Sequence, residues 1–241
     1  MIYVPSEYDA FINGESFSQN GLFFIRRPNI PAAERDDEFI DIPGRSGALT
    51  VSNGCYKDVE VDFELNFMSE TADKWGISRR KANHFLSKAK QKELVFSDDA
   101  YFYRKIKGVT IGAIERTSKR IGVLTPRIRL DPFEYLLDGK KEISEYSTIV
   151  NQYDEALPVY LITGEGVCNL TVNGNSIQAN VGQNLTINID LQIAYRTDSG
   201  AINNTAISGN YEDLKLIPGE NTVSITNGFG LKVIPNWRVA S

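Results

Sequence analysis

The clearest pattern in the chain is a strict alternation of apolar and polar residues between Lys57 and Phe67. Because successive side chains of a β-strand point to opposite faces, a period of two predicts a strand with one buried face. The other face is expected to meet solvent or a partner subunit. The apolar positions are Val59, Val61, Phe63, Leu65 and Phe67, and the polar ones are Asp58, Glu60, Asp62, Glu64 and Asn66.

Further strand-like segments surround this one in the first 140 residues. They cover residues 21–27, 38–42, 93–96, 101–115 and 120–130. Pro28, Pro31 and the Pro43-Gly44 pair interrupt the early segments, as turn-forming residues do. The first part of the chain is therefore predicted to consist mainly of β-strands.

One helix is predicted in this part, from Ser69 to about Lys90. Apolar residues recur there at helical spacing and form one stripe, made of Trp75, Ala82, Phe85, Leu86 and Ala89. Ser69 or Thr71 is the expected N-terminal cap. The acidic residues at 70 and 73 and the lysines at 88, 90 and 92 suit the two ends of the helix dipole.

The second part of the chain reads as short strands with no helical pattern. Asn173-Gly174 is a strong hairpin signal, and Asn227-Gly228 and Pro218-Gly219 mark further turns. Short strands at regular spacing predict a β-sandwich. The expected strands are residues 157–163, 167–172, 176–179, 184–191, 211–217, 221–226 and 230–234.

Composition changes at the same place as the pattern. Residues 1–140 hold 21 basic and 21 acidic side chains, whereas residues 141–241 hold 5 basic and 10 acidic ones and so carry the whole net charge of −5. Asparagine rises from 6 to 13 residues across this point, and aromatic residues fall from 18 to 7. We therefore predict two domains, residues 1–138 and 139–241, with a turn near Asp138-Gly139-Lys140.

Charge and cysteine content exclude several classes of protein. A net charge of −5 argues against a nucleic-acid binder, which normally carries a basic face. No run of 18 apolar residues is present, so no membrane-spanning helix is expected, and the N-terminus has no signal-peptide pattern. Cys55 and Cys168 are too few for a disulfide framework or a Cys-rich zinc site. Synthesis in a reducing compartment is expected.

The row of carboxylates at positions 58, 60, 62 and 64 is the first candidate for chemistry. Neighbours two residues apart on a strand lie roughly 7 Å from each other, which could serve acid–base work on a glycoside or hold a hard cation. We favour a solvated or subunit-facing strand surface, because nothing nearby supplies a polar pocket.

Other candidates also favour ordinary structural interpretations. His84 is the only histidine, which excludes a zinc site built from several histidines, and it is expected on the surface of the helix. The charged residues 34–38 are interpreted as a solvated loop, and Gly164-Glu165-Gly166 as a turn between strands. Three glycosylation sequons, beginning at residues 169, 184 and 203, are interpreted as Asn-rich strands and turns. We assign no catalytic, cofactor-binding or metal-binding residue and predict a protein that is not an enzyme.

Nine pieces of the chain, in order, resemble the distal tail protein family of long, non-contractile-tailed phages. The four in the first part are ERDDEFIDIPGRSGAL (34–49), YKDVEVDFELNF (56–67), VFSDDAYFYRK (95–105) and RIRLDPFEY (127–135). The five in the second part are LPVYLITGEG (157–166), LTVNG (170–174), LTINID (185–190), LKLIPGENTVSI (214–225) and LKVIPNWR (231–238). Together they extend over nearly the whole chain.

The resemblance implies a mainly β protein with a defined place in the virion. The N-terminal domain is expected to be a β-sandwich with one helix and a protruding hairpin, and the C-terminal domain a galectin-like or carbohydrate-module-like β-sandwich. Six copies are expected to form a hub ring at the tail tip, made in the cytoplasm of the bacterial host. The ring would join the tail tube protein to the tail-associated tip protein and often carries receptor-binding proteins. DNA would pass through its channel without specific binding, and no membrane or cofactor is implied.

Two alternatives to a structural hub stay open from the sequence. One is a carbohydrate-binding module protein that binds host-wall glycans through the C-terminal sandwich, and the other is a hydrolase. Sugar sites need aromatic faces and clustered polar groups. Tyr195 and Tyr211 are the plausible platforms, since Tyr160 is expected in the core and Trp237 lies near the end of the chain. We therefore expect weak or no glycan binding. For the hub, we expect few Lys and Arg side chains on the channel wall, where they would trap DNA phosphates.

Overall fold

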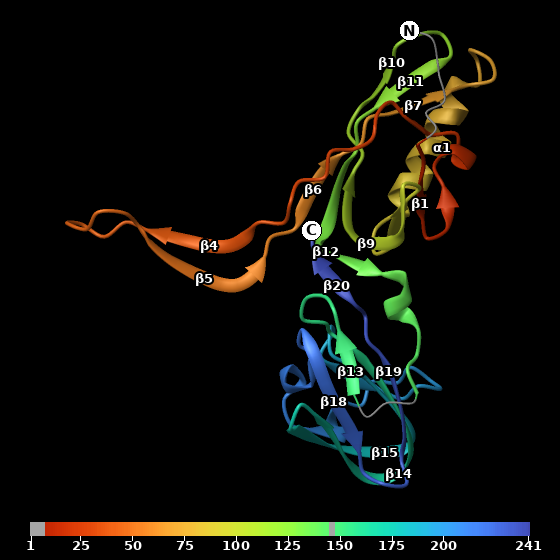
Figure 1. Ribbon diagram of the computed structural model, residues 1–241. Helices are drawn as coiled ribbons and strands as arrows, with labels where there is room; N and C mark the ends of the chain where they lie inside the picture. The colour runs from red at the N-terminus through yellow and green to blue at the C-terminus, as the bar shows by residue number, and fades with distance from the viewer. Residues whose placement is uncertain (1–7, 145–147) are drawn as a thin grey trace. The chain divides into compact units, whose positions relative to one another are not determined.

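The computed structural model describes residues 8–144 and 148–241 (Figure 1). The described residues form two compact units that divide between Glu134 and Tyr135, and the last two residues of the chain belong to the first unit. Each unit has its own apolar core. The chain end returns to the first unit, where the N–H of Ser241 donates to the carbonyl oxygen of Pro132 at 3.1 Å.

The first unit is mainly β, with one α-helix, as expected. One sheet has the strand order β2-β1-β8-β9-β12-β20 with β6 also paired to β12, and a second has the order β10-β11-β7-β3. The strands of the first sheet are β1 (Ala10–Ile12), β2 (Glu15–Ser16), β6 (Val59–Asp62), β8 (Glu93–Phe96), β9 (Asp99–Thr110), β12 (Arg127–Leu136) and β20 (Arg238–Ala240). Those of the second are β3 (Phe23–Phe24), β7 (Leu65–Met68), β10 (Ile114–Arg116) and β11 (Ile121–Leu124).

The alternating segment buries its apolar side chains, as predicted, but it serves two sheets. Its five apolar residues are at most 3% exposed. Strand β6 pairs with β12, whereas β7 pairs with β11 and β3. Between the two strands, the N–H of Phe63 donates to Pro126 O at 2.9 Å and Glu64 O accepts from the Ile25 N–H at 2.8 Å. One continuous pattern thus crosses from the first sheet to the second and places Phe63 between them.

Helix α1 (Trp75–Ser87) is shorter than predicted, and neither expected capping residue caps it. Lys74 occupies the N-cap position without a side-chain hydrogen bond. The buried Ser69 hydroxyl instead donates to the carbonyl oxygens of Thr71 and Arg120, which holds the preceding residues in a turn. The predicted apolar stripe is correct, because Ala82, Phe85 and Leu86 are buried.

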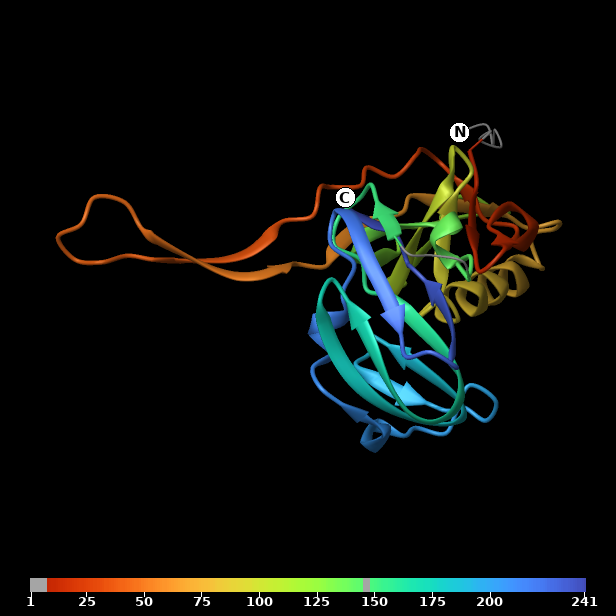
Figure 2. The ribbon, with the colours of Figure 1, turned by 60° about the horizontal axis from the view of Figure 1, so that its bottom comes forward.

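Strands β4 (Arg35–Ile40) and β5 (Leu49–Tyr56) form a separate antiparallel hairpin. It projects from the rest of the first unit in both views (Figures 1 and 2). The interpretation of residues 34–38 as a loop is wrong for 35–38, which lie in β4. Charged residues can form a strand here because both faces of the hairpin are largely exposed. The Pro43-Gly44 turn lies at the tip, between the two strands.

The second unit is all β apart from short 3-10 turns, with the strand order β13-β18-β14-β15-β16, β17 on β15 and β19 on β14. Its strands are β13 (Thr148–Asn151), β14 (Val159–Val172), β15 (Asn175–Asn188), β16 (Ile193–Tyr195), β17 (Ile207–Ser208), β18 (Gly219–Ile225) and β19 (Gly230–Ile234). The 3-10 turns of the chain are η1 (Ser18–Asn20), η2 (Leu137–Lys140), η3 (Asn204–Ala206) and η4 (Tyr211–Leu214).

Two long strands organise the second unit. Strands β14 and β15 pair over fourteen positions around the predicted Asn173-Gly174 turn, whose positive φ angles of 52° and 84° suit a tight hairpin. One end of β14 pairs with β19 and the other with β18, so the long, curved hairpin joins both of these strands to one sheet (Figure 2). The sequence pattern had divided each of these strands into two.

The predicted turn at Gly164-Glu165-Gly166 is the reason that β14 was divided. These residues lie inside β14 and pair with residues 181–183. Gly164 has a φ of 146°, and a Cβ there would lie 2.4 Å from the ring of Phe229. Glycine is therefore required for a local distortion within one strand, not for a turn between two.

Residues 211–217 are also not a strand, because Tyr211–Leu214 form η4. The side chain of Asn210 accepts a hydrogen bond from the Glu212 N–H and so favours the turn. Leu214 is buried, and its carbonyl oxygen accepts a hydrogen bond of 2.7 Å from the hydroxyl of Tyr160. Tyr160 lies in the core, as predicted, with its one polar atom satisfied.

Candidate interaction surfaces

The row of four carboxylates forms a ladder of ion pairs. Arg127 holds Asp62 through two hydrogen bonds of 2.8 and 3.0 Å, and Arg129 lies 2.8 Å from Glu60. Both pairs face each other directly across β12 and β6. Asp58 pairs with Lys107 at 2.6 Å, and Glu64 pairs with Arg26. Each carboxylate therefore has a cationic partner.

The electrostatics of this ladder favour charged carboxylates. The hydrogen bond from Arg127 lowers the pKa of Asp62, and the same bond raises the pKa of Arg127. A general acid needs the opposite shift, a carboxyl pKa raised toward neutrality. The arrangement thus matches a solvated strand face. The sequence interpretation missed the two arginines, although alternation in Arg127-Ile128-Arg129-Leu130 is the signal that could have paired them with β6.

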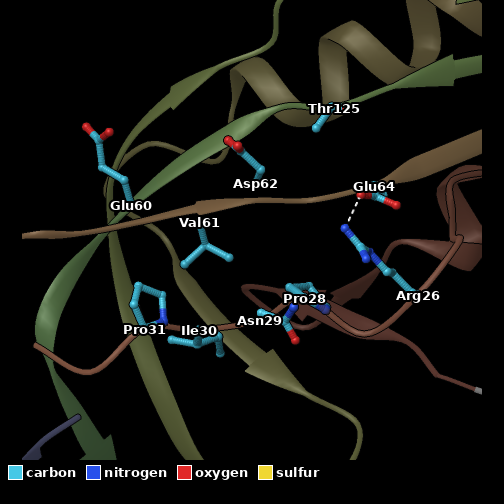
Figure 3. A pocket seen from close by; sticks show the side chains of 10 residues that line it. All are labelled: Arg26, Pro28, Asn29, Ile30, Pro31, Glu60, Val61, Asp62, Glu64 and Thr125. Carbon is cyan, nitrogen blue, oxygen red and sulfur yellow. Dashed lines mark hydrogen bonds and ion pairs between the residues drawn. The ribbon is translucent and has the colours of Figure 1, made fainter.

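A pocket of about 460 Å³ lies beside this row (Figure 3). The Pro28–Pro31 segment forms one wall. Val61 points toward Ile30 and Pro31, while Glu60 and Asp62 leave β6 on its other side. The three carboxylates that line the pocket are all paired, Glu64 with Arg26, Asp62 with Arg127 and Glu60 with Arg129. The pocket is lined by Arg26, Pro28, Asn29, Ile30, Pro31, Glu60, Val61, Asp62, Glu64 and Thr125.

The β4–β5 hairpin exposes an apolar face. Ile40 and Leu49 are directly opposite each other in the register, and Val51 lies two residues along on the same face. These three side chains are 38–40% exposed, and Phe39 on the opposite face is 70% exposed. Contiguous exposed apolar side chains on a projecting hairpin are typical of a surface that another chain covers.

The remaining sequence candidates stay apart from one another. His84 is exposed on α1, Cys55 is exposed on β5, and Cys168 is buried in the core of the second unit. Among residues 8–144 and 148–241, no group of three or more His, Cys, Asp or Glu side chains could hold a metal ion. No helix in this part of the chain is long and apolar enough to cross a membrane.

The aromatic residues considered for sugar binding are half-buried. Trp237 and Tyr211 pack against the core of the second unit. Tyr195 is also half-buried, at the end of β16. Exposed aromatic faces are what a sugar ring stacks on. Weak or absent glycan binding remains a prediction.

Comparisons with known proteins find similarity in structure and not in sequence. No protein-family model matches the chain, and no curated protein matches its sequence. The Dit protein of phage SPP1, described as a paradigm of the hub adsorption apparatus in phages infecting Gram-positive bacteria, has a similar structure, with a TM-score of 0.70 and 11% identity. The similarity covers 95% of this chain and 98% of that one.

Two further matches come from the phage P2 baseplate in its activated conformation. The chain from the baseplate with Ca has a TM-score of 0.52, 11% identity and coverage of 97% of this chain and 98% of that one. The chain from the baseplate with Sr has a TM-score of 0.50, 11% identity and coverage of 94% and 96%. Across nearly its whole length, this chain therefore has the two-domain β fold of the SPP1 distal tail protein.

Proposed function

We propose that this chain is a structural hub protein that forms a hexameric ring at the distal end of a long, non-contractile phage tail. The observation that carries the proposal is the structural similarity to SPP1 Dit over 95% of the chain, which includes both units. A sugar-binding module alone would match only the second unit. Fold does not determine function by itself, so the proposal also needs support from surfaces.

The proposed ring would occupy the tail tip of the virion. It would join the tail tube protein on one side to the tail-associated tip protein on the other, and carry receptor-binding proteins. DNA would pass through its channel without specific contacts. The ion-pair ladder on β6 and β12 leaves its carboxylates charged and paired, as on a structural surface.

The first unit would build the ring, with the hairpin as a contact to a neighbouring copy. The apolar face of Ile40, Leu49 and Val51 supports this assignment, because a monomer leaves it in water. Burying such side chains releases roughly 25 cal/mol for each Å² of apolar surface. A symmetric ring repeats this gain at every interface.

The test is the molar mass of the whole chain measured by light scattering over a range of concentrations. We expect the parent protein to have a molar mass six times that of one chain. Replacing Ile40, Leu49 and Val51 together by Ser should leave a folded monomer, since none of the three supports the core. Val167→Ser is the matched control, because this residue is 56% exposed on β14 in the other unit and should not affect assembly. A hexamer that survives the triple change would refute the role of the hairpin.

A further inference from the structure

Helix α1 and the turn after it carry a charge opposite to that of the protein. Residues 74–92 contain seven basic side chains, one histidine and no acidic residue. The remaining residues hold 19 of the 26 basic side chains and all 31 acidic ones, a formal charge of −12. So steep a separation of charge along one short segment favours attraction of an anionic partner.

Most of these cations have no ion pair. Lys74 pairs with Glu70 at 2.6 Å, and the Lys81 ammonium donates to the Gln19 carbonyl oxygen at 3.4 Å. In the part of the chain that the structure describes, no carboxylate lies within 4.0 Å of the remaining five, which are Arg79, Arg80, Lys88, Lys90 and Lys92. Basic residues on β9 and β12, by contrast, are tied to carboxylates.

The helix arranges part of this charge beside exposed apolar surface. Ile77, Lys81, His84 and Lys88 follow one another at spacings of four, three and four residues, so they lie along one face of α1. Ile77 is 58% exposed. A groove of about 270 Å³ separates this face from residues 12–20, and Lys81, His84, Lys88 and Lys92 all line it.

The floor of the groove distinguishes between anionic partners. The nearly buried side chains of Ile12 and Phe85 contribute to the lining, together with the amides Asn13 and Asn20. Glu15 also lines the groove, so the carboxylates of a partner are expected on the side of the lysines. A protein segment can place carboxylates on the lysines and an apolar side chain near Ile77, and its amide groups can meet the asparagines.

We propose that the basic face of α1 and the turn after it, defined by Ile77, Lys81, His84, Lys88 and Lys92, is a docking surface for an acidic segment of another protein that carries an apolar anchor. The charges steer the segment, and the apolar anchor fixes its register. This inference rests on α1, the turn after it and the groove beside residues 12–20, and it does not depend on ring formation.

Binding of a defined probe to the full chain tests the proposal. The probe is a fluorescein-labelled peptide of glutamates with two central leucines, followed by fluorescence anisotropy. The triple variant K81E/K88E/K92E should bind it at least tenfold more weakly, and Ile77→Ser several-fold more weakly. The control variant K57E/K119E/K232E, which reverses three exposed lysines elsewhere, should bind as the parent does. If the first triple variant does not fold, Lys88→Glu and a salt series provide the same comparison.

Two further probes separate the alternatives. A peptide with Ser in place of both leucines should bind more weakly than the leucine peptide, and so should a single-stranded oligonucleotide of equal charge. Equal or tighter binding of the oligonucleotide would overturn the proposal in favour of a phosphate site. Loss of self-association in K81E/K88E/K92E would overturn it in favour of a second copy as the occupant. Unchanged peptide binding in that variant would also overturn it.

Discussion

The protein contains two hairpins of opposite character. Strands β14 and β15 pair over fourteen positions, and their side chains alternate between the core and solvent. Strands β4 and β5 are exposed on both faces, although the apolar Phe39, Ile40, Leu49 and Val51 lie among them. The first hairpin is stabilised within its own unit. In the second, these four apolar side chains are 38–70% exposed, and packing within the chain is seen at its base, where the ring of Tyr56 meets that of Phe133.

This difference indicates that the β4–β5 hairpin, and not the β14–β15 hairpin, contributes to association between chains. An isolated two-stranded hairpin is only marginally stable in water. Its outward-facing apolar side chains therefore stabilise the protein only when a partner covers them. Substitutions in the core should therefore change the stability of the chain, whereas substitutions on the β4–β5 hairpin should change association and leave stability almost unaltered.

The largest effect is expected from two phenylalanines in these different settings. Phe63→Ala removes a fully buried ring between the two sheets of the first unit and should cost about 3–5 kcal/mol of unfolding free energy. Phe39→Ala, at 70% exposure, should change it by less than about 0.5 kcal/mol. Urea denaturation of the two variants measures both values. Similar losses in both would contradict the contrast between core and hairpin.

A comparison of glycines is expected to give the next largest effect. Gly164→Ala combines a φ of 146° with a clash against Phe229, and should cost about 2–4 kcal/mol. Gly54→Ala in β5 has a φ of 70° but open space around the new methyl group, so only the backbone cost of about 1 kcal/mol remains. Thermal unfolding of each variant compares them, and an equal loss would show that Phe229 moves aside without cost.

Tyr160→Phe isolates one buried hydrogen bond within the packed hairpin. The change leaves the ring in place and removes the hydroxyl that donates to the Leu214 carbonyl oxygen at 2.7 Å. That oxygen then loses this hydrogen bond. An unsatisfied buried acceptor costs about 1–2 kcal/mol. Chemical denaturation measures the loss. A variant as stable as the parent would mean that water reaches the carbonyl.

The smallest effect concerns a surface ion pair beyond β16. Hydrogen bonds, first from Arg196 and then from Asn184 and Ser199, lower the pKa of Asp198 to about 2 from its ordinary value of 3.8. A lowered carboxyl pKa contributes stability that is present above pH 4 and is lost as the pH falls toward 2. Arg196→Gln should raise this pKa toward 3.8 and weaken that dependence slightly, because the pair is exposed. NMR titration of the Asp198 carboxyl measures the pKa, with Lys232→Gln as the control. A value that stays near 2 would assign the shift to other partners.

The sequence was sufficient for features that depend on local periodicity. The alternation of Val59 to Phe67 predicted a buried strand face, and Asn173-Gly174 predicted a hairpin. Both predictions succeed because each pattern depends on the conformation of its own segment of backbone. The sequence was insufficient for features that depend on contacts with residues far away in the chain. The requirement for glycine at 164 comes from Phe229, and the switch between sheets at Phe63 comes from pairing with β11 and β12.

Surfaces were the hardest to predict. Residues 35–38 resemble a charged loop because a projecting strand has no buried face to impose alternation. The ion-pair ladder requires the register of β6 and β12, which two separate segments do not reveal. From the sequence, the lysines near the end of α1 were interpreted only as suited to the helix dipole. The groove beside them could not be predicted, because its other side is formed by residues 12–20.

Electron microscopy of the purified full chain tests the central claim most directly. Negative-stain class averages should show closed rings with six-fold symmetry and an open centre. The Ile40, Leu49 and Val51 serine variant should show single-chain particles at the same concentration. Discrete single-chain or two-chain particles from the parent protein, at concentrations where its hairpin face is intact, would contradict a ring-forming hub.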